Sequence, residues 1–293
     1  MPDSSLRSLI QQKLKRQFSG LSHMIDFIPI GGGSINQTYR LSSSHHTIFC
    51  KVNSASKFPH LFQREKNGLN LIKKQNLIKV PEVIDCFEAG GCQVLLLEWI
   101  KTGEKTESFW KKLGEQLAAL HQVSNNYFGL EEDNYMGSVL QTNKPSNNWI
   151  NFFVQQRLQP LILKCANENL LSTKHQQQFE NLCQFLSNIF EKEQKPALLH
   201  GDLWSGNYMC NEMSEPVLID PAVYFGHPSV DMGMTTLFGG FRPSFYEAYN
   251  YHFPFPSNYL EQWELCNLYP LLIHLHLFGR SYLAQIEQTL HKF

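Results

Sequence analysis

The sequence of 293 residues predicts an α+β fold built from two lobes. Up to about residue 100, short apolar runs are separated by glycine or polar turns, which favours short strands joined in an antiparallel sheet. Beyond residue 101 the apolar residues recur every three or four positions, which indicates helices. We therefore expect an N-terminal lobe over residues 1–100, with a five-stranded antiparallel sheet and one inserted helix, and a mainly helical C-terminal lobe over residues 101–293.

The N-terminal lobe should begin with a short amphipathic helix at residues 4–18, where apolar residues recur at helical spacing. A second helix is expected at residues 59–75, with Pro59 near its start, where the missing N–H of proline costs least. The strands are expected in the runs FIPI, INQTYRL, TIFCKV, EVIDCFEA and CQVLLLEWI.

Helical periodicity in the second lobe is clearest at residues 148–165 and 174–190. Two short apolar strands, ALLH and VLID, lie between helices. The aromatic-rich segments 238–253 and 259–290 predict further helices.

Composition excludes several classes of partner. The net charge is -1, so we expect no electrostatic attraction to nucleic acid or to an anionic membrane. No run reaches the roughly 18 uninterrupted apolar residues of a membrane span, and the N-terminus lacks a signal-peptide pattern. We expect a cytoplasmic protein.

The seven cysteines are scattered without a C-x-x-C pair, which fits neither a disulfide framework nor a zinc site.

The segment LLHGDLWSGNYMCNEMSEPVLIDPAVYFG, residues 198–226, carries the strongest chemical signal. It contains the pattern H-x-D-x-x-x-x-N, followed by an apolar strand that ends in a second aspartate. Transfer of a γ-phosphoryl group needs a carboxylate to accept the hydroxyl proton, and oxygen ligands for magnesium (Mg2+). We predict that Asp202 is the base and that Asn207 and Asp220 hold the metal. A polar loop with capping residues is the alternative, but the flanking strands and the first lobe favour phosphoryl transfer.

Lys51 ends the third apolar strand, and Glu65 lies in the following helix. This matches a kinase site in which a strand lysine contacts the phosphates of ATP and pairs with a helix glutamate. A lone strand lysine is more often a solvated edge residue, and the catalytic segment is what favours the functional role here. Arg64 and Lys66 are interpreted as solvated helix charges.

A glycine-rich turn follows the first strand, where a phosphate-covering loop would lie, and glycines let backbone N–H groups approach anionic oxygens. A plain turn is the alternative, because the pattern G-x-G-x-x-G is absent. The end of the fifth strand is where backbone groups would bond adenine, an assignment that rests on position alone. Besides Lys51 and Glu65, the residues predicted at the nucleotide are Gly31, Gly32, Gly33, Ser34, Glu98, Trp99 and Ile100.

Three further features have alternative interpretations. Asp231 either caps a helix or supports the catalytic loop. His274 and His276 face opposite sides of a helix, so we expect core or surface histidines and no joint metal site. The acidic residues 131–133 are interpreted as a solvated turn.

The motifs HGDLWSGN, LIDPAVYFGH, VDMGMTTLFGGF, GGGSINQTYRL, FCKVN and FQREKNGLNLI occur together over residues 31–241. In this combination the chain resembles the fructosamine kinase (ketosamine-3-kinase) family. The resemblance implies a two-lobed, protein-kinase-like fold and ATP-dependent phosphorylation of the sugar 3-hydroxyl of ketosamines, either small molecules or glycated proteins. Phosphate at that position is a good leaving group, so the phosphorylated product would break down and release the free amine. The resemblance therefore implies deglycation of the amine or protein that carried the sugar. Trp204 would be a platform for the sugar, with a buried core position as the alternative.

Two other functions fit the same core motifs. One is a kinase of another small alcohol, such as an aminoglycoside, choline or methylthioribose, and the other is a catalytically dead nucleotide-binding scaffold. We expect a monomer or a weak homodimer. Some relatives carry a cysteine in the glycine-rich loop that forms an intersubunit disulfide, whereas this chain has Ser34 there.

Overall fold

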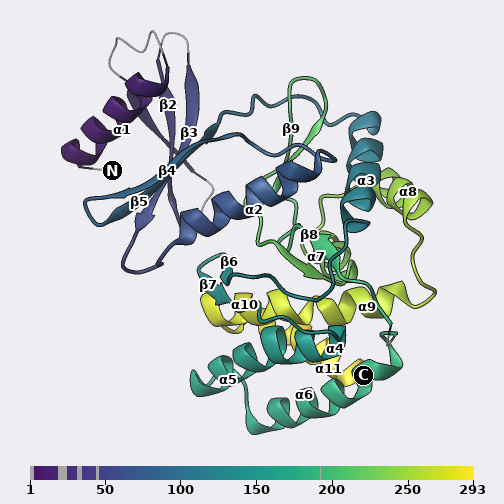
Figure 1. Ribbon diagram of the computed structural model, residues 1–293. Helices are drawn as coiled ribbons and strands as arrows, with labels where there is room; N and C mark the ends of the chain where they lie inside the picture. The colour runs from purple at the N-terminus through teal and green to yellow at the C-terminus, as the bar shows by residue number, and fades with distance from the viewer. Residues whose placement is uncertain (1–2, 19–24, 32–34, 44–45, 192) are drawn as a thin grey trace.

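A computed structural model describes residues 3–18, 25–31, 35–43, 46–191 and 193–293 (Figure 1). Its first part contains a five-stranded antiparallel sheet in the order β1-β2-β3-β5-β4. The strands are β1 (Asp26–Ile30), β2 (Gln37–Ser42), β3 (Thr47–Ser54), β4 (Val83–Ala89) and β5 (Cys92–Glu98). The predicted sheet is confirmed.

Two helices cover opposite faces of this sheet (Figure 1). Helix α1 (Ser4–Gln17) packs with the face that carries Val94 and Leu96, whereas α2 (Leu61–Gln75) packs with the face that carries Leu95 and Leu97. This alternation follows from the period of two along a strand. Helix α2 begins later than predicted, because His60 has a left-handed backbone (φ 61°) and the helix starts after it.

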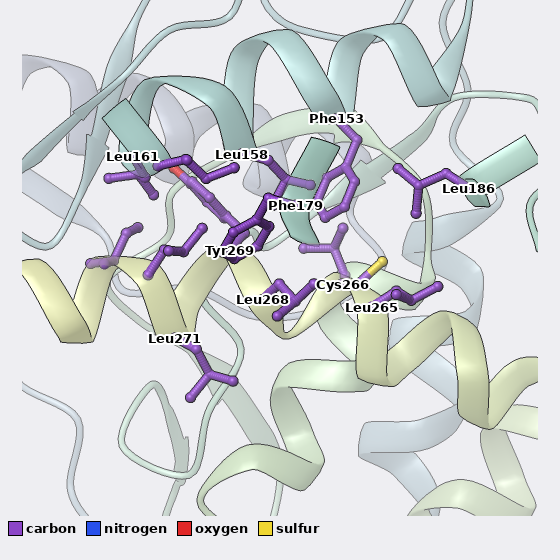
Figure 2. Packing of buried hydrophobic residues seen from close by; sticks show 14 of the residues in the cluster. Phe153, Leu158, Leu161, Phe179, Leu186, Leu265, Cys266, Leu268, Tyr269 and Leu271 are labelled. Carbon is purple, nitrogen blue, oxygen red and sulfur yellow. The ribbon is translucent and has the colours of Figure 1, made fainter. Parts of the chain in front are cut away.

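The second part of the chain is mainly helical, as predicted. Its α-helices are α3 (Glu107–His121), α4 (Trp149–Phe152), α5 (Gln159–Asn167), α6 (Thr173–Phe185), α7 (Ser229–Leu237), α8 (Pro243–His252), α9 (Tyr259–Cys266), α10 (Leu268–Phe278) and α11 (Leu283–Lys292). A π-helical segment, Phe153–Leu158, joins α4 to α5, and 3-10 turns lie at Leu186–Asn188 and Arg280–Tyr282. Figure 2 shows part of the core, where side chains of α9 and α10 meet those of the π-helical segment, α5 and α6.

Six short strands complete the second lobe. Strand β8 (Ala197–Leu199) pairs with β11 (Tyr224–Gly226), and β9 (Tyr208–Cys210) pairs with β10 (Pro216–Leu218). A further hairpin, β6 (Asn134–Met136) with β7 (Val139–Gln141), was not predicted from the sequence. The helices predicted over residues 259–290 are confirmed as α9, α10 and α11, and α10 ends before Gly279, whose φ is 85°.

Strand β5 ends at Glu98 and helix α3 begins at Glu107. We propose that the boundary between the lobes lies in this connection, with residues 1–100 on one side and 101–293 on the other. Among the residues that the structure describes, every helix is too short or too polar to cross a bilayer.

Helices α3 and α8 approach each other closely at Gly114. A Cβ atom on Gly114 would lie 2.2 Å from the carbonyl oxygen of Phe245 and 2.9 Å from the backbone nitrogen of Tyr249. Helix propensity alone predicts that Gly114→Ala stabilises the protein by about 1 kcal/mol. Because the contact is with backbone, we instead expect a loss of about 1–3 kcal/mol in the free energy of unfolding, measured by urea denaturation.

The control is Gly31→Ala, because an added Cβ there would meet no heavy atom within 4 Å. Its free energy of unfolding should change by less than about 0.5 kcal/mol. A Gly114→Ala protein more stable than the parent would show that α8 does not depend on this close approach.

Candidate active site

Lys51 is a buried cation that two carboxylates contact. The residue lies on β3 and is 1% exposed. Its Nζ donates to Oε1 of Glu65 on α2 at 2.7 Å, and to Oδ1 of Asp220, which follows β10, at 2.5 Å. One cation therefore connects the sheet, helix α2 and the second lobe.

Burial and the neighbouring charges act in opposite directions on the protonation of Lys51 and of Glu65. Burial alone would lower the pKa of Lys51, but the carboxylates of Asp220 and Glu65 raise it above its ordinary value. Burial raises the pKa of Glu65 to about 7, and Lys51 opposes this shift. Lys51 therefore stays charged at neutral pH.

Asp202 and Asn207 lie together on the loop between β8 and β9. The amide Nδ2 of Asn207 donates to the carbonyl oxygen of Asp202 at 2.8 Å and to its Oδ2 at 3.0 Å. Burial raises the pKa of the Asp202 carboxyl to about 7, although the hydrogen bond from Asn207 lowers it. A carboxyl group with a pKa near neutral is suited to general base catalysis.

His200 joins the loop of Asp202 to the end of the strand that precedes Asp220. Its Nδ1 accepts the N–H of Asp202 at 3.3 Å, and its Nε2–H donates to the carbonyl oxygen of Ile219 at 2.9 Å. Between them, Gly201 has a φ of 84°, and a Cβ there would lie 2.1 Å from the carbonyl oxygen of Ala222. Glycine is required at this position for both reasons.

Asp231 supports the catalytic loop through hydrogen bonds to the loop backbone. Its Oδ2 accepts the N–H of His200 at 2.7 Å, and its Oδ1 accepts the N–H of Gly201 at 2.8 Å. The fully buried His121 contacts the same carboxylate through Nε2 at 3.1 Å. Helix α7 has Pro228 at its N-cap and no side-chain cap. Of the two interpretations of Asp231, support of the loop is confirmed and helix capping is wrong.

Asp220 has a φ of 54°, in the left-handed region. A residue other than glycine in a sparsely populated region costs about 1–3 kcal/mol. The ion pair with Lys51 acts on this same residue, and we infer that it compensates for the backbone strain.

The predicted catalytic and metal-binding residues come together in one cavity. Asp202, Asn207 and Asp220 line a space of about 360 Å³ between the lobes, and Lys51 and Glu65 line it from the other side. Gly31 and Trp204 are also among the lining residues. The sequence-based grouping of these residues therefore corresponds to a single cleft.

The other predicted nucleotide contacts fall into two groups. Gly32, Gly33 and Ser34 lie outside the described residues. Glu98, Trp99 and Ile100 are described, but none of the three lines the cavity. The N–H of Glu98 donates to the carbonyl oxygen of Glu82 at 2.9 Å, and the Trp99 ring lies 6.5 Å from that of Phe49. Their contact with adenine stays a prediction.

A polar contact between α2 and the second lobe was not predicted from the sequence. Arg64 on α2 forms an ion pair with Glu132, and Asn67 Nδ2 donates to Glu132 Oε1 at 2.8 Å. Tyr135 on β6 donates from its hydroxyl to the carbonyl oxygen of Pro59 at 3.0 Å. The interpretation of Arg64 as a solvated charge is therefore wrong. In the predicted solvated turn, Glu132 forms this contact, whereas Glu131 and Asp133 are exposed as expected. No local pattern links residues so distant in sequence.

Trp204 stands at the edge of the cleft as part of an aromatic group. The residue is 37% exposed, and its ring meets that of Phe238 edge-on at 5.9 Å. The ring of His274 lies 5.0 Å from Phe238. The buried alternative for Trp204 is wrong, and its contact with a substrate stays a prediction. The other histidine of this helix, His276, lies at the surface. Its Nδ1 is 2.6 Å from Oε2 of Glu168, as expected for a surface histidine.

Comparison with known proteins identifies the family of this chain. The sequence profile of fructosamine kinases matches residues 6–293. The chain belongs to the fructosamine kinase family. An Enterococcus faecium protein assigned as a ketoamine kinase is 36% identical over 91% of this chain and 94% of its own. A chloroplastic protein-ribulosamine 3-kinase of Arabidopsis thaliana is 35% identical over 86% of this chain and 78% of its own.

Among solved structures, a protein assigned as a fructosamine-3-kinase of Haemophilus somnus superposes with a TM-score of 0.86. It is 27% identical, and the match covers 97% of this chain and 96% of the other. The resemblance inferred from the motifs is therefore confirmed, and so is the two-lobed, protein-kinase-like fold of this fructosamine kinase family member.

Asp231→Ala tests the support of the catalytic loop. The change leaves two buried N–H groups without an acceptor, and each such group costs about 1–3 kcal/mol. We expect the free energy of unfolding to fall by about 2–5 kcal/mol in urea denaturation. We also expect kcat for ADP formation to fall about tenfold or more in conditions where the variant is folded, because Asp202 loses its position.

Asp3→Ala is the matched control. Asp3 caps α1 by accepting the N–H of Leu6 at 2.8 Å, far from the cleft in sequence and on the outer helix of the sheet. Its loss should cost about 1 kcal/mol of stability and leave kcat unchanged. Full kcat in folded Asp231→Ala would remove Asp231 from the positioning of the loop.

Proposed function

We propose that this protein transfers the γ-phosphoryl group of ATP to the 3-hydroxyl of a ketosamine sugar, with magnesium as the metal. The convergence of Lys51, Glu65, Asp202, Asn207 and Asp220 on one cavity carries the proposal. These residue types supply the phosphate contact, the base and the metal ligands that phosphoryl transfer needs. The names of the relatives, ketoamine kinase and ribulosamine 3-kinase, support the substrate class.

The oxygen atoms at the cleft fit a magnesium ion. The Asp220 side chain is 42% exposed, so a carboxylate oxygen is accessible from the cavity. The amide nitrogen of Asn207 is engaged with Asp202, which leaves its Oδ1 for a metal. Carboxylate and amide oxygens are the hard ligands that magnesium prefers. When bound, the ion would neutralise charge on the transferring phosphoryl group.

Asp202 accepts the proton of the sugar hydroxyl. It lies on a loop that His200, Gly201 and Asp231 hold in place, so its carboxylate needs little reorganisation when the substrate arrives. Lys51 binds phosphate oxygens of ATP, and Glu65 keeps the Lys51 side chain oriented toward the cleft. In this role Lys51 exchanges its contact with Asp220 for phosphate, which frees the Asp220 carboxylate for the metal.

Trp204 orients the sugar. An exposed indole ring offers a flat apolar face against which the C–H groups of a sugar can pack. Phe238 supports the ring from one side, and Gly206 allows it to lie close, because a Cβ there would be 2.3 Å from the indole. The sugar hydroxyl is thereby brought to the side of the cavity that Asp202 lines.

The position of phosphorylation determines the fate of the product. Loss of a proton from carbon 1 of the ketosamine gives an enol with a carbon 1–carbon 2 double bond, and phosphate on carbon 3 then leaves with its bonding electrons. Water hydrolyses the resulting imine and releases the amine. Deglycation is therefore a consequence of phosphorylation at oxygen 3. A cytoplasmic location and a monomer or weak homodimer stay predictions from the sequence.

The direct test uses fructosyl-lysine and ribulosyl-lysine with ATP and magnesium, followed by 31P nuclear magnetic resonance. We expect ADP together with a sugar phosphate on oxygen 3, which then decays to inorganic phosphate and free amine. Asp202→Asn should lower the rate of ADP formation by about 100-fold or more while ATP still binds.

Two outcomes would contradict the proposal. Phosphate on oxygen 6 would be stable, because it lacks this elimination path. Turnover of an aminoglycoside or choline without turnover of either ketosamine would place the protein with kinases of other alcohols.

A further inference from the structure

A second large cavity lies in the C-terminal lobe, behind the catalytic loop. Its volume is about 550 Å³, within the range of about 300–1,000 Å³ typical of small-molecule sites. Its wall comes from the end of α3, the segment before β8, the start of α7, the end of α8 and α9. As far as the described residues define them, this cavity and the active-site cleft have no lining residue in common.

Aromatic rings form much of the wall. Tyr249 and Phe255 stack with their centroids 5.3 Å apart and their planes at 16°, and the Trp263 ring stands edge-on to Phe255 at 5.0 Å. Phe253 lines the same space, and Pro254 and Pro256 restrict the backbone around it. Flat apolar walls favour a flat apolar ligand, because stacking and edge contacts then add to burial of surface.

His227, one of the lining residues, has a ring N–H for which the described residues offer no acceptor. His227 is 4% exposed, and its Nδ1 accepts the N–H of Ser229 at 3.2 Å, so the neutral ring carries its proton on Nε2. Burial lowers the pKa of His227 to about 3, so the ring is neutral at physiological pH. Among the described residues nothing accepts from this Nε2–H, nor from Nε1–H of Trp263, which lines the same wall. A ligand with an acceptor atom would satisfy such a donor.

Residues of the cavity wall are connected by hydrogen bonds to Asp231, the residue that supports the catalytic loop. His121 and Tyr249 line the cavity, and the Tyr249 hydroxyl bonds His121 Nδ1 at 2.7 Å. The other ring nitrogen of His121 contacts Asp231, the residue that accepts the N–H groups of His200 and Gly201. A ligand that shifts the Tyr249 or His121 ring would therefore act on the loop that carries Asp202.

We propose that this cavity binds a flat aromatic molecule with one uncharged hydrogen-bond acceptor, and that its occupancy alters the catalytic loop through His121 and Asp231. The acceptor bonds the Nε2–H of His227, and the ring system packs against the aromatic wall that Tyr249, Phe255 and Trp263 form together. This site is distinct from the cleft, and binding there does not depend on which sugar the enzyme phosphorylates.

Isoquinoline and naphthalene are matched probes, because they have the same shape and only isoquinoline has an acceptor nitrogen. We expect saturable binding of isoquinoline to the full chain, followed by protein nuclear magnetic resonance at pH 8. His227→Phe should weaken isoquinoline binding about three- to tenfold and leave naphthalene binding nearly unchanged. Ser124→Trp, which places a large ring in the cavity wall, should abolish binding of both probes.

The effect on the loop is read by amide hydrogen exchange, which needs no turnover. Saturating isoquinoline should change exchange of the His200 and Gly201 amides about fivefold or more in the parent protein, and not in Ser124→Trp. Binding that Ser124→Trp leaves intact, or that His227→Phe leaves unaltered, would overturn the site. Binding without any change in exchange would overturn its connection to the catalytic loop.

Discussion

The burial of Lys51 is the constraint on which the rest of the structure depends. Removing an ammonium group from water costs several kcal/mol, and only well-placed partners offset that cost. Here Glu65 and Asp220 supply two carboxylates, one from a helix of the first lobe and one from a loop of the second. The lobes must therefore meet at this point, and the cleft forms around it. Two of these three groups, Lys51 and Asp220, are the ones that we propose contact the nucleotide and its metal.

A second buried charge, Asp231, fixes the other half of the site. It accepts two backbone N–H groups of the catalytic loop and contacts His121. Gly201 lets the loop lie directly against Ala222, where a Cβ would come within 2.1 Å of the carbonyl oxygen. Asp202 is thus held by backbone geometry. Asp220 forms its ion pair with Lys51 in the absence of nucleotide. Because the loop is fixed by its own hydrogen bonds, we propose that Asp202 needs little movement during phosphoryl transfer.

Much of this site could be predicted from the sequence, because its signals are local. The spacing of His200, Asp202 and Asn207 within one loop, and the short apolar runs of β3 and β5, are short-range patterns. The contact between Arg64 and Glu132 and the hairpin of β6 and β7 could not be predicted. The first joins residues far apart in sequence, and strands of three residues are too short to show a period. The second cavity has no sequence signal either, because its wall is assembled from five separate segments.

The most direct measurement of the central claim is a double-mutant cycle in the absence of nucleotide. It compares the free energies of unfolding of the parent, Lys51→Met, Glu65→Gln and the double variant in urea. The exposed pair Lys79–Glu215, whose side chains are 52% and 31% exposed, is the control cycle. We predict an interaction energy of about 1–3 kcal/mol for Lys51 with Glu65, against about 0–1 kcal/mol for the exposed pair. Additive effects at Lys51 and Glu65, within about 0.5 kcal/mol, would contradict the account that this buried ion pair organises the site.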